Sequence, residues 1–364
     1  MRGTAERQAK MLMGVTSEDF IPAQHPIRRI RAVTEQVLKE LSPELTKMYA
    51  ERGRASTPPE HLIKASLLMA FYSIRSERQF CERLQYDLLF KWFLGLNITD
   101  PAFDHSTFSK NRQRLMDNAI AEAVLGAVVR EAQRRGLVSE EHFTVDGTLL
   151  QAWASLKSYE PRGQEPPRDG GSSGKNPTVN FHGSKRSNAT HVSKTDAEAM
   201  LARKGNGQET KPCFSGHTLM ENRNGLILEL KVKQATGTAE REAALEMLDR
   251  WRPDKSKQVT LGADKGYDAQ TFIAALHVRN VVPHVAQNKS GRRSAVDEVT
   301  AESPGYALSQ RVRKRVEECF GWTKTVGNGR KLRYIGTARN QLWASLTAAA
   351  YNLTRMANIE ATSA

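Results

Sequence analysis

The sequence predicts an α/β fold in which an all-helical N-terminal region precedes a mixed sheet flanked by helices. Apolar residues recur at helical spacing through roughly the first 135 positions, and from residue 140 short strands alternate with helices. Two of those strands end in an aspartate followed closely by glycine. We therefore expect residues 1–135 to form a helical domain and residues 136–364 to form an α/β domain.

Three helices are expected in the first hundred residues. Pro26–Leu41 carries apolar residues three and four positions apart, and Thr57 with the two following prolines marks the start of a helix that runs to Tyr72. The apolar pattern continues over Ser76–Leu96, which predicts one further helix. A chain of 364 residues is long enough for two domains and a well-buried core.

A short basic helix is expected next, capped by Asp104 or Ser106. It presents Lys110, Arg112 and Arg114, which suits a helix-turn-helix element lying in a DNA groove. The alternative is a surface helix with ordinary solvated charges. The pattern favours DNA contact by a small margin.

The remaining elements alternate between strands and helices. A Pro-, Gly- and Ser-rich stretch predicts a flexible insertion at about residues 156–192, and Asn224-Gly225 predicts a hairpin turn. The expected strands are His142–Gly147, Gly216–Leu219, Leu226–Val232, Gln258–Asp264 and Val281–Val285, and the expected helices are Thr238–Trp251, Ala269–Arg279, one helix in the 310s and Thr337–Asn358.

Composition narrows the possible partners and location of the chain. Its 54 Lys and Arg against 40 Asp and Glu leave a net charge of +14, which favours a polyanion such as DNA, although a merely basic soluble protein has a similar balance. No apolar stretch is long enough for a bilayer, and no secretion signal is evident. The three cysteines lie far apart, so we expect reduced thiols in a cytoplasmic, nucleoid-associated protein without membrane contact.

Two aspartates at strand ends predict a metal site. Asp146 follows the apolar Phe143–Val145, and Asp264 follows Val259–Ala263. Ligands of open α/β sheets bind at the carboxyl ends of strands, and two carboxylates placed there repel each other unless a cation lies between them. Hard oxygen ligands of this kind suit magnesium.

Glu317 is the third candidate ligand. The helix expected in the 310s places Arg313 and Lys324 on the same side as Glu317, while Val312, Val316, Phe320 and Thr323 form the packing face. Glu318 points elsewhere. Ordinary ion pairs on a surface helix explain any one of these carboxylates, but they explain the combination of all three less well.

These motifs resemble those of bacterial insertion-sequence DDE transposases, specifically the insertion sequence five group with a DUF772-like N-terminal domain. Val145-Asp146-Gly-Thr matches the first acidic motif and Ala263-Asp264-Lys-Gly-Tyr267 the second. The Arg, three residues, Glu, six residues, Lys signature is found at Arg313, Glu317 and Lys324. The signature often begins with Tyr three residues earlier, where this chain has Gln310.

The resemblance implies a ribonuclease H-like catalytic domain that cleaves element ends and transfers their 3′-hydroxyls to target DNA. Asp146 would bridge two Mg²⁺ ions, for which Mn²⁺ substitutes, with Asp264 and Glu317 each completing one site. Arg313 and Lys324 would hold phosphates. Trp322 would stack on an unpaired base or, more simply, pack in the core. The partners would be double-stranded DNA with terminal inverted repeats and target DNA, bound by a homodimer.

Two other functions stay open at this stage. The chain fits a structure-selective nuclease with the same fold, or a catalytically silent DNA-binding descendant of a transposase. Near the predicted site, His142, Lys265 and Tyr267 are either functional or structural, and Asp196 is a candidate accessory residue.

Overall fold

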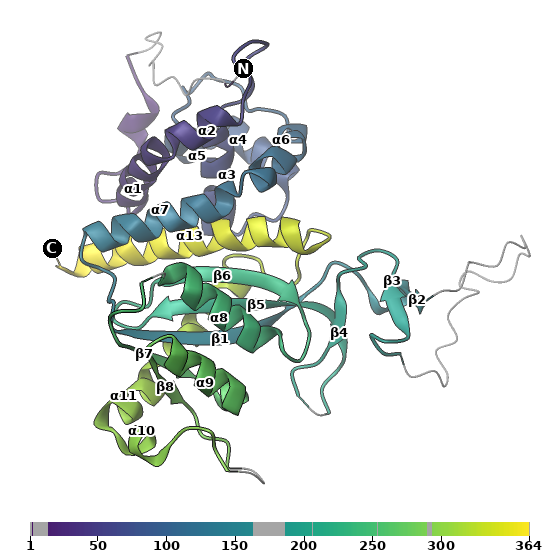
Figure 1. The fold of residues 1–364 in the computed structure, drawn as a ribbon. Coiled ribbons are helices and arrows are strands. Elements are labelled where there is room, and N and C mark those ends of the chain that lie inside the picture. Colours follow the sequence, from purple (N-terminus) through teal and green to yellow (C-terminus); the bar gives the residue numbers. More distant parts are fainter. Residues whose placement is uncertain are drawn as a thin grey trace, which may run out of the picture.

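The structure is a computed structural model that describes residue 2 and residues 14–162, 186–205, 207–252, 254–289 and 293–363. The central part of the predicted insertion, 163–185, lies outside the described residues. At its base the short strands β2 (Tyr159–Pro161) and β3 (His191–Ser193) pair antiparallel, next to the 3₁₀ turn η2 (Leu156–Ser158). This pair projects sideways from the rest of the chain (Figure 1).

The N-terminal region is helical, as predicted. Its elements are η1 (Ser17–Phe20), α1 (Ile27–Glu40), α2 (Ser42–Lys47), α3 (Pro59–Phe71), α4 (Glu77–Tyr86), α5 (Leu88–Leu94), α6 (Ser106–Asp117) and α7 (Ile120–Arg134). The predictions for Pro26–Leu41 and for a helix beginning after Thr57 are confirmed by α1 and α3. The predicted basic helix is α6.

The expectation of a single helix over Ser76–Leu96 is wrong. Asp87 adopts an extended backbone and its carboxylate accepts a hydrogen bond from the Phe90 amide at 3.1 Å, so a new helix starts there. Arg83 donates to the same carboxylate at 2.8 Å. An aspartate that can satisfy the first amides of a helix competes with helix continuation, and the apolar periodicity does not reveal that competition.

A mixed sheet follows the helices, as predicted. Its strands are β1 (His142–Gln151), β4 (Met200–Ala202), β5 (Lys211–Glu221), β6 (Ile227–Gln234), β7 (Val259–Ala263) and β8 (Val281–Val285). β5 runs antiparallel to β1, and both β6 and β4 pair antiparallel with the other edge of β5. β7 and β8 continue the sheet on the other side of β1 as parallel strands. The antiparallel and the parallel halves of the sheet therefore meet at β1.

The remaining helices cover the sheet and extend beyond its parallel edge (Figure 1). They are α8 (Ala239–Trp251), α9 (Gln270–Val278), α10 (Glu298–Glu302), α11 (Pro304–Val312) and α12 (Arg315–Thr325), together with the 3₁₀ turn η3 (Lys265–Tyr267). The single helix expected in the 310s is therefore two. Bonds from the Val316 amide to Arg313 and from the Glu317 amide to Lys314 span only three residues, so the backbone tightens between α11 and α12.

The packing face of α12 also differs in part from the expected one. Val316 and Thr323 are buried as predicted, but Cys319 completes the face, while Val312 and Phe320 are only half-buried. The tightened turn places Val312 on α11, so it is not part of the same helical stripe.

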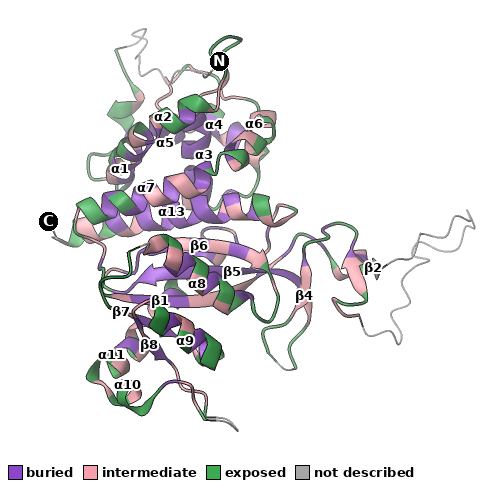
Figure 2. Cartoon of the chain, viewed as in Figure 1, coloured by how far each residue is buried: buried purple, intermediate pink, exposed green. Residues whose placement is uncertain are grey.

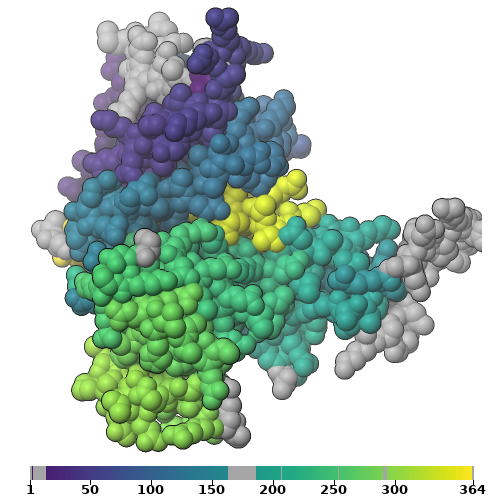
Figure 3. All heavy atoms as spheres, viewed as in Figure 1, coloured from purple at the N-terminus to yellow at the C-terminus, as the bar shows by residue number. Residues whose placement is uncertain are grey.

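The last helix, α13 (Thr337–Ser363), joins the helical region to the sheet. It packs against α7, α3 and β6, and its predicted apolar face is buried: Leu342, Leu346, Ala349, Leu353 and Met356. Figure 2 shows that both α7 and α13 are mostly buried, and in Figure 3 α13 reaches the visible surface mainly at one end. One continuous apolar core therefore runs from the N-terminal helices into the sheet.

A buried amide fixes α13 to the sheet. Asn352 is fully buried, and its side chain accepts from the Ile227 amide at 2.8 Å and donates to the Ile227 carbonyl at 2.7 Å. Asn352→Ala leaves both backbone groups without a partner, so we expect the free energy of unfolding to fall by about 2–4 kcal/mol. Urea denaturation measures this loss. Asn358→Ala, on the exposed side of the same helix, is the control and is expected to change stability by less than about 0.5 kcal/mol.

Within the described residues, no helix has the length and apolar character needed to cross a membrane. Cys81, Cys213 and Cys319 are free thiols, as predicted, and all three are buried.

Candidate active site

The two predicted aspartates lie where β1 and β7 separate. The parallel pairing of these strands ends at Thr144 opposite Gly262, and Asp146 and Asp264 each follow two residues later. Equal offsets from one register pair place the two carboxylates at the same height on adjacent strands. The prediction that Asp146 ends its strand is wrong, because β5 continues to pair with β1 as far as Gln151. Only the pairing with β7 ends there.

Asp146 is the strongly perturbed carboxyl of the pair. Burial raises its pKa to about 7; the Gly147 amide, which donates to it at 2.8 Å, lowers the pKa, whereas the charges of Asp264 and Glu240 raise it. The charge of Arg313 lowers the pKa of Asp146 and so partly offsets the effect of these two acids. A carboxyl that is buried beside like charges favours a bound proton or a bound cation.

Asp264 caps the turn that follows β7. Its carboxylate accepts from the Gly266 amide at 2.8 Å, which fixes the side chain at the end of the strand. Tyr267 is buried beneath this turn, and burial, together with the charges of Glu240, Asp146 and Asp264, raises the pKa of its phenol well above the usual range. Tyr267 is thus a neutral group close to the acids, whereas Lys265 is exposed.

Gln310 and Arg313 form a connected pair beside the acids. The Gln310 side chain donates to the His284 carbonyl on β8 at 2.6 Å, and its oxygen accepts from Arg313 Nε at 2.9 Å. Arg313 also lies against Gly262, where a Cβ would come within 3.3 Å of the Arg313 Cβ. Gln310, which departs from the family signature, therefore orients the arginine of that signature.

Glu317 and Lys324 lie on α12, while Arg313 lies in the preceding turn, so the expectation that all three share one helix is wrong. The i→i+3 bonds of that turn are the physical reason. Lys324 reaches β1 and donates from Nζ to Thr148 Oγ1 at 2.6 Å. Glu317 is exposed, whereas Glu318 pairs with Arg355 at 3.5 Å and so points elsewhere, as predicted.

The acids fit a divalent cation in their chemistry. Within the described part of the chain, Asp146, Asp264 and Glu317 form no ion pair, although the protein carries an excess of 14 positive charges. Throughout the part of the chain that the structure describes, no three His, Cys, Asp or Glu side chains are grouped closely enough to hold a metal. Asp146 and Asp264 lie close enough for the charge of Asp264 to raise the pKa of Asp146, whereas Glu317, on α12, does not complete a group of three that could hold a metal.

A third acid near the pair was missed in the sequence. Glu240, in the first turn of α8, lies against Gly147, where a Cβ would come within 2.8 Å of Glu240 Oε1. Its charge acts on Asp146, and burial together with Asp264 raises the pKa of Glu240. The sequence signal was an acid in the first helical turn, which is common for reasons unrelated to a site.

The predicted DNA contacts of α6 divide into two groups. Lys110 is exposed, but Arg112 pairs with Glu77 and stacks on Tyr334, and Arg114 stacks on Tyr49. Arg112 and Arg114 thus hold neighbouring segments together. Interactions between distant segments of this kind leave no local pattern in the sequence.

Of the aromatic residues, Trp322 packs edge-on against Tyr351 on α13 with ring centroids 5.7 Å apart. Trp153, which was not among the predicted site residues, follows β1 and keeps 50% of its surface exposed between the buried Ala152 and Ala154. Lys331 Nζ lies 5.4 Å from the centre of its ring. An exposed tryptophan with a cation above it is a surface suited to a nucleic-acid base.

The remaining candidates have structural roles. His142 bonds Thr260 Oγ1 at 2.7 Å, and burial lowers its pKa to about 4, so it is neutral. Asp196 accepts from the Gly336 and Glu198 amides, both at 3.3 Å, and so connects the segment after the insertion to the start of α13.

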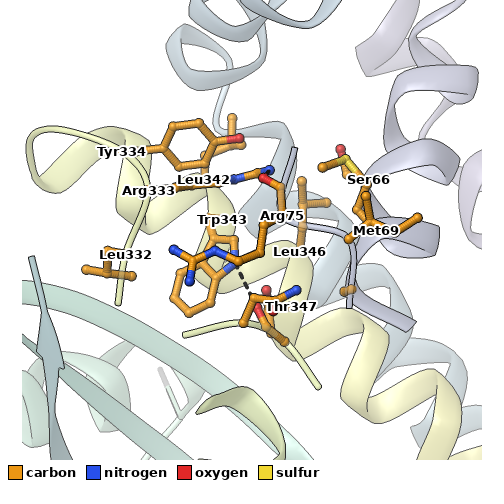
Figure 4. Close-up of a pocket in the computed structure, with 14 residues that line it drawn as sticks. Ser66, Met69, Arg75, Leu332, Arg333, Tyr334, Leu342, Trp343, Leu346 and Thr347 are labelled. Carbon is orange, nitrogen blue, oxygen red and sulfur yellow. Dashed lines mark hydrogen bonds between the residues drawn. The ribbon is translucent and has the colours of Figure 1, made fainter. Parts of the chain in front are cut away.

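A cavity beside α3 is distinct from the acids. It lies between α3 and the segment before α13, where Arg75, Arg333, Tyr334 and Trp343 line it (Figure 4). Its volume of about 40 Å³ has room for a few water molecules and not for a nucleotide. The acids on β1 and β7 therefore stay the candidate site.

Comparisons with known proteins identify the family of the chain. A family model described as a transposase domain (DUF772) matches residues 15–114, and one described as a transposase DDE domain matches residues 177–353. None of the curated proteins compared with the chain is a significant match. The two family-model matches define a transposase with a DDE catalytic domain. The chain belongs to the DDE transposases, which are metal-dependent enzymes that cleave and join DNA.

Two solved structures resemble the chain remotely. A piggyBac transposase synaptic complex with hairpin DNA has a TM-score of 0.43 at 10% identity, over 95% of this chain and 78% of that chain. A pre-cleavage Mos1 transpososome has a TM-score of 0.22 at 11% identity, over 86% of this chain and 82% of that chain. The family models alone carry the assignment.

Proposed function

We propose that Asp146, Asp264 and Glu317 hold divalent cations, magnesium by preference, and that this site cleaves element ends and joins their 3′-hydroxyls to target DNA. The observation that carries the proposal is the placement of Asp146 and Asp264 at equal height where β1 and β7 separate. Bound metal would polarise the scissile phosphate and activate the attacking oxygen. Glu317, on α12 beside β1, supplies the third carboxylate.

The cationic side chains around the acids would hold the DNA backbone. Arg313, oriented by Gln310, presents a guanidinium next to Asp146. Lys324 reaches Thr148, two residues further along β1 on the same face as Asp146. Arg313 and Lys324, one on each side of the acid pair, would bind phosphates that flank the bond to be cut. Lys110, on the exposed side of α6, would contact DNA further away.

An assay with pre-cut ends tests the proposed joining activity. The full chain is given Mg²⁺, a target duplex and labelled element-end DNA whose 3′-hydroxyl is already free. A transposase joins the labelled end to the target, and Asp264→Asn removes the joined product. Cleavage of duplex DNA with no joined product would instead indicate a nuclease and would contradict the proposal.

The same proposal extends to the type of mobile element, its DNA ends and the oligomeric state of the protein. We infer an insertion-sequence element of the insertion sequence five group, terminal inverted repeats bound by a homodimer, and action in the cytoplasm at the nucleoid. Residues 1–135 would serve as the DNA-binding domain and 136–364 as the catalytic domain. The net charge of +14 supports a polyanionic partner.

Trp153 is expected to contribute to DNA affinity, and Trp322 to stability. Trp153→Ala removes an exposed stacking surface, so affinity for element-end DNA should fall by about 1–3 kcal/mol while the melting temperature stays unchanged. Trp322→Ala removes a packed ring and should lower the melting temperature. Fluorescence anisotropy and thermal denaturation of both variants measure the two effects. Equal DNA affinity of Trp153→Ala and the unmodified protein would contradict this assignment.

A further inference from the structure

Two connections that are far apart in the sequence meet beside the end of β1. Residues 72–76, between α3 and α4, lie against residues 326–336, between α12 and α13 (Figure 4). Three hydrogen bonds from side chains to backbone carbonyls join the two connections, and they tie the helical region to the sheet at this place. The bonds run from Ser73 Oγ to Val326 at 2.9 Å, from Arg75 to Lys331 at 2.8 Å and from Arg333 to Arg75.

The connection between α12 and α13 is held in one conformation. The Gly329 amide donates to the Thr323 carbonyl at 2.9 Å, and a Cβ at position 329 would lie 2.6 Å from the Trp343 ring, so this close approach requires glycine. The Leu332 amide donates to the Gln151 carbonyl at the end of β1 at 2.7 Å. The two residues between Gly329 and Leu332 are therefore presented at a defined place next to β1.

Those two residues and Arg75 are cations without acidic partners. Arg75 and Arg330 are exposed, and Lys331 lies over the ring of Trp153. Among the residues that the structure describes, none of the three cations forms an ion pair. The sequence contains no Asp or Glu from residue 326 to 336, and none between residues 146 and 160. This surface therefore carries positive charge that the protein itself leaves unbalanced.

Several arginines elsewhere in the helical region are neutralised instead. Arg83 pairs with Asp87 at 2.8 Å, and Arg135 pairs with Glu131 at 2.7 Å. Arginines that hold the fold together thus have carboxylates beside them. Cations gathered on one surface without such partners repel each other, and phosphates relieve that repulsion while they release bound counterions. The arrangement beside β1 therefore suits a polyanion.

We propose that Arg75, Arg330 and Lys331 form a basic seam that binds the phosphate backbone of double-stranded element-end DNA, on the element side of the cut. This inference rests on the proposed function. Gln151, which pairs with Lys331, lies five residues beyond Asp146 on β1, and an extended strand of that length spans about 17 Å. One DNA strand passes a phosphate about every 3.4 Å along the duplex axis. The seam thus meets the DNA about five phosphates from the bond that is cut.

The element side is favoured over the flanking side because of what happens to the two pieces of DNA. The element end stays bound through cleavage and joining, whereas the flanking DNA leaves after the first step. A surface fixed by hydrogen bonds before DNA arrives stabilises the piece that is held through both steps.

The salt dependence of DNA binding by the full chain tests the seam. Fluorescence anisotropy with a labelled element-end duplex in EDTA gives the slope of log affinity against log KCl concentration, to which each phosphate contact contributes about 0.9. The variant with both Arg330→Gln and Lys331→Gln should lower the slope by about 1.8 and weaken binding about tenfold per lost charge at about 0.1 M salt. Arg330→Gln alone removes no described contact and should lower the slope by about 0.9, while Arg330→Lys should keep it.

Arg54→Gln is the matched control, because this exposed arginine precedes the opposite end of α3. Its slope and affinity should equal those of the unmodified chain. An unchanged slope in Arg330→Gln, or an equal decrease in Arg54→Gln, would overturn the seam. Since the measurement is made in EDTA, it does not depend on the metal chemistry. Absence of joining in Mg²⁺ together with a lowered slope in Arg330→Gln would refute the proposed chemistry and leave the DNA surface established.

Neutral methylphosphonates placed in the duplex locate the contact. At about five to seven phosphates from the cut on the element side, they should weaken binding by the unmodified chain but not by the variant with both substitutions, because the lost contact is the same one. Weakening only by methylphosphonates on the flanking side would contradict the assignment to element DNA.

Equal weakening of the unmodified chain and the double variant would show that other residues bind these phosphates.

Discussion

Asp146→Asn is expected to abolish metal-dependent cleavage of element-end DNA while DNA binding is retained. The substitution keeps the size of the side chain and removes the charge that would attract the cation at the opening between β1 and β7. Loss of one preorganised electrostatic group costs about 10²–10³-fold in rate, and loss of the metal ligand on β1 should cost at least that much. Cleavage of a labelled duplex in Mg²⁺ measures the rate, and a gel-shift assay measures binding.

Asn358→Ala is a suitable control for general effects of mutation, because it lies on the exposed side of α13. Cleavage by Asp146→Asn at a rate within tenfold of the unmodified chain would show that this carboxylate is not a metal ligand. Loss of both cleavage and DNA binding would indicate a folding defect, which thermal denaturation detects directly.

The second large effect is a pH-dependent stabilisation of the metal-free protein by the same substitution. The pKa of Asp146 rises from 3.8 to about 7 on folding, because the carboxyl is buried beside Asp264 and Glu240. Between these values the folded chain keeps a proton that the unfolded chain releases. Raising the pH through this window therefore destabilises the folded state by about 1.4 kcal/mol per pH unit, and the loss is complete above pH 7.

Asp146→Asn has no such proton, so its advantage over the unmodified chain should grow with pH. In EDTA, the difference in free energy of unfolding should be roughly 2–3 kcal/mol larger at pH 8 than at pH 5. Urea denaturation at the two pH values provides the comparison. Metal binding requires the same proton to leave, so Mg²⁺ affinity should fall about tenfold per pH unit below 7. A stability difference that does not change with pH would contradict the burial of a charged cluster here.

The sequence predicted those parts of the fold that depend on local patterns. Regular apolar spacing located α1, α3, α8 and α13, and Asn224-Gly225 located the turn between β5 and β6. The break at Asp87 and the turn at Arg313 escaped prediction, because each depends on a few hydrogen bonds that leave the apolar periodicity intact. Local competition of this kind is settled by geometry that a pattern does not contain.

For the site, the sequence supplied the two strand aspartates because their context is local, an apolar strand followed by glycine. It missed Glu240 and Trp153, whose importance depends on which distant segments they meet. Arg112 and Arg114 illustrate the opposite case. Their spacing suggested DNA contact, but tertiary partners such as Glu77 and Tyr49 engage them.

The central claim is that Asp146, Asp264 and Glu317 converge on one metal centre. The most direct measurement is the anomalous diffraction signal of Mn²⁺ in crystals of the full chain bound to element-end DNA. The account predicts manganese about 2.0–2.3 Å from oxygens of all three carboxylates, distances typical of hard cations with oxygen ligands. Manganese bound elsewhere, or bound by the two aspartates while Glu317 stays turned to solvent, would contradict it.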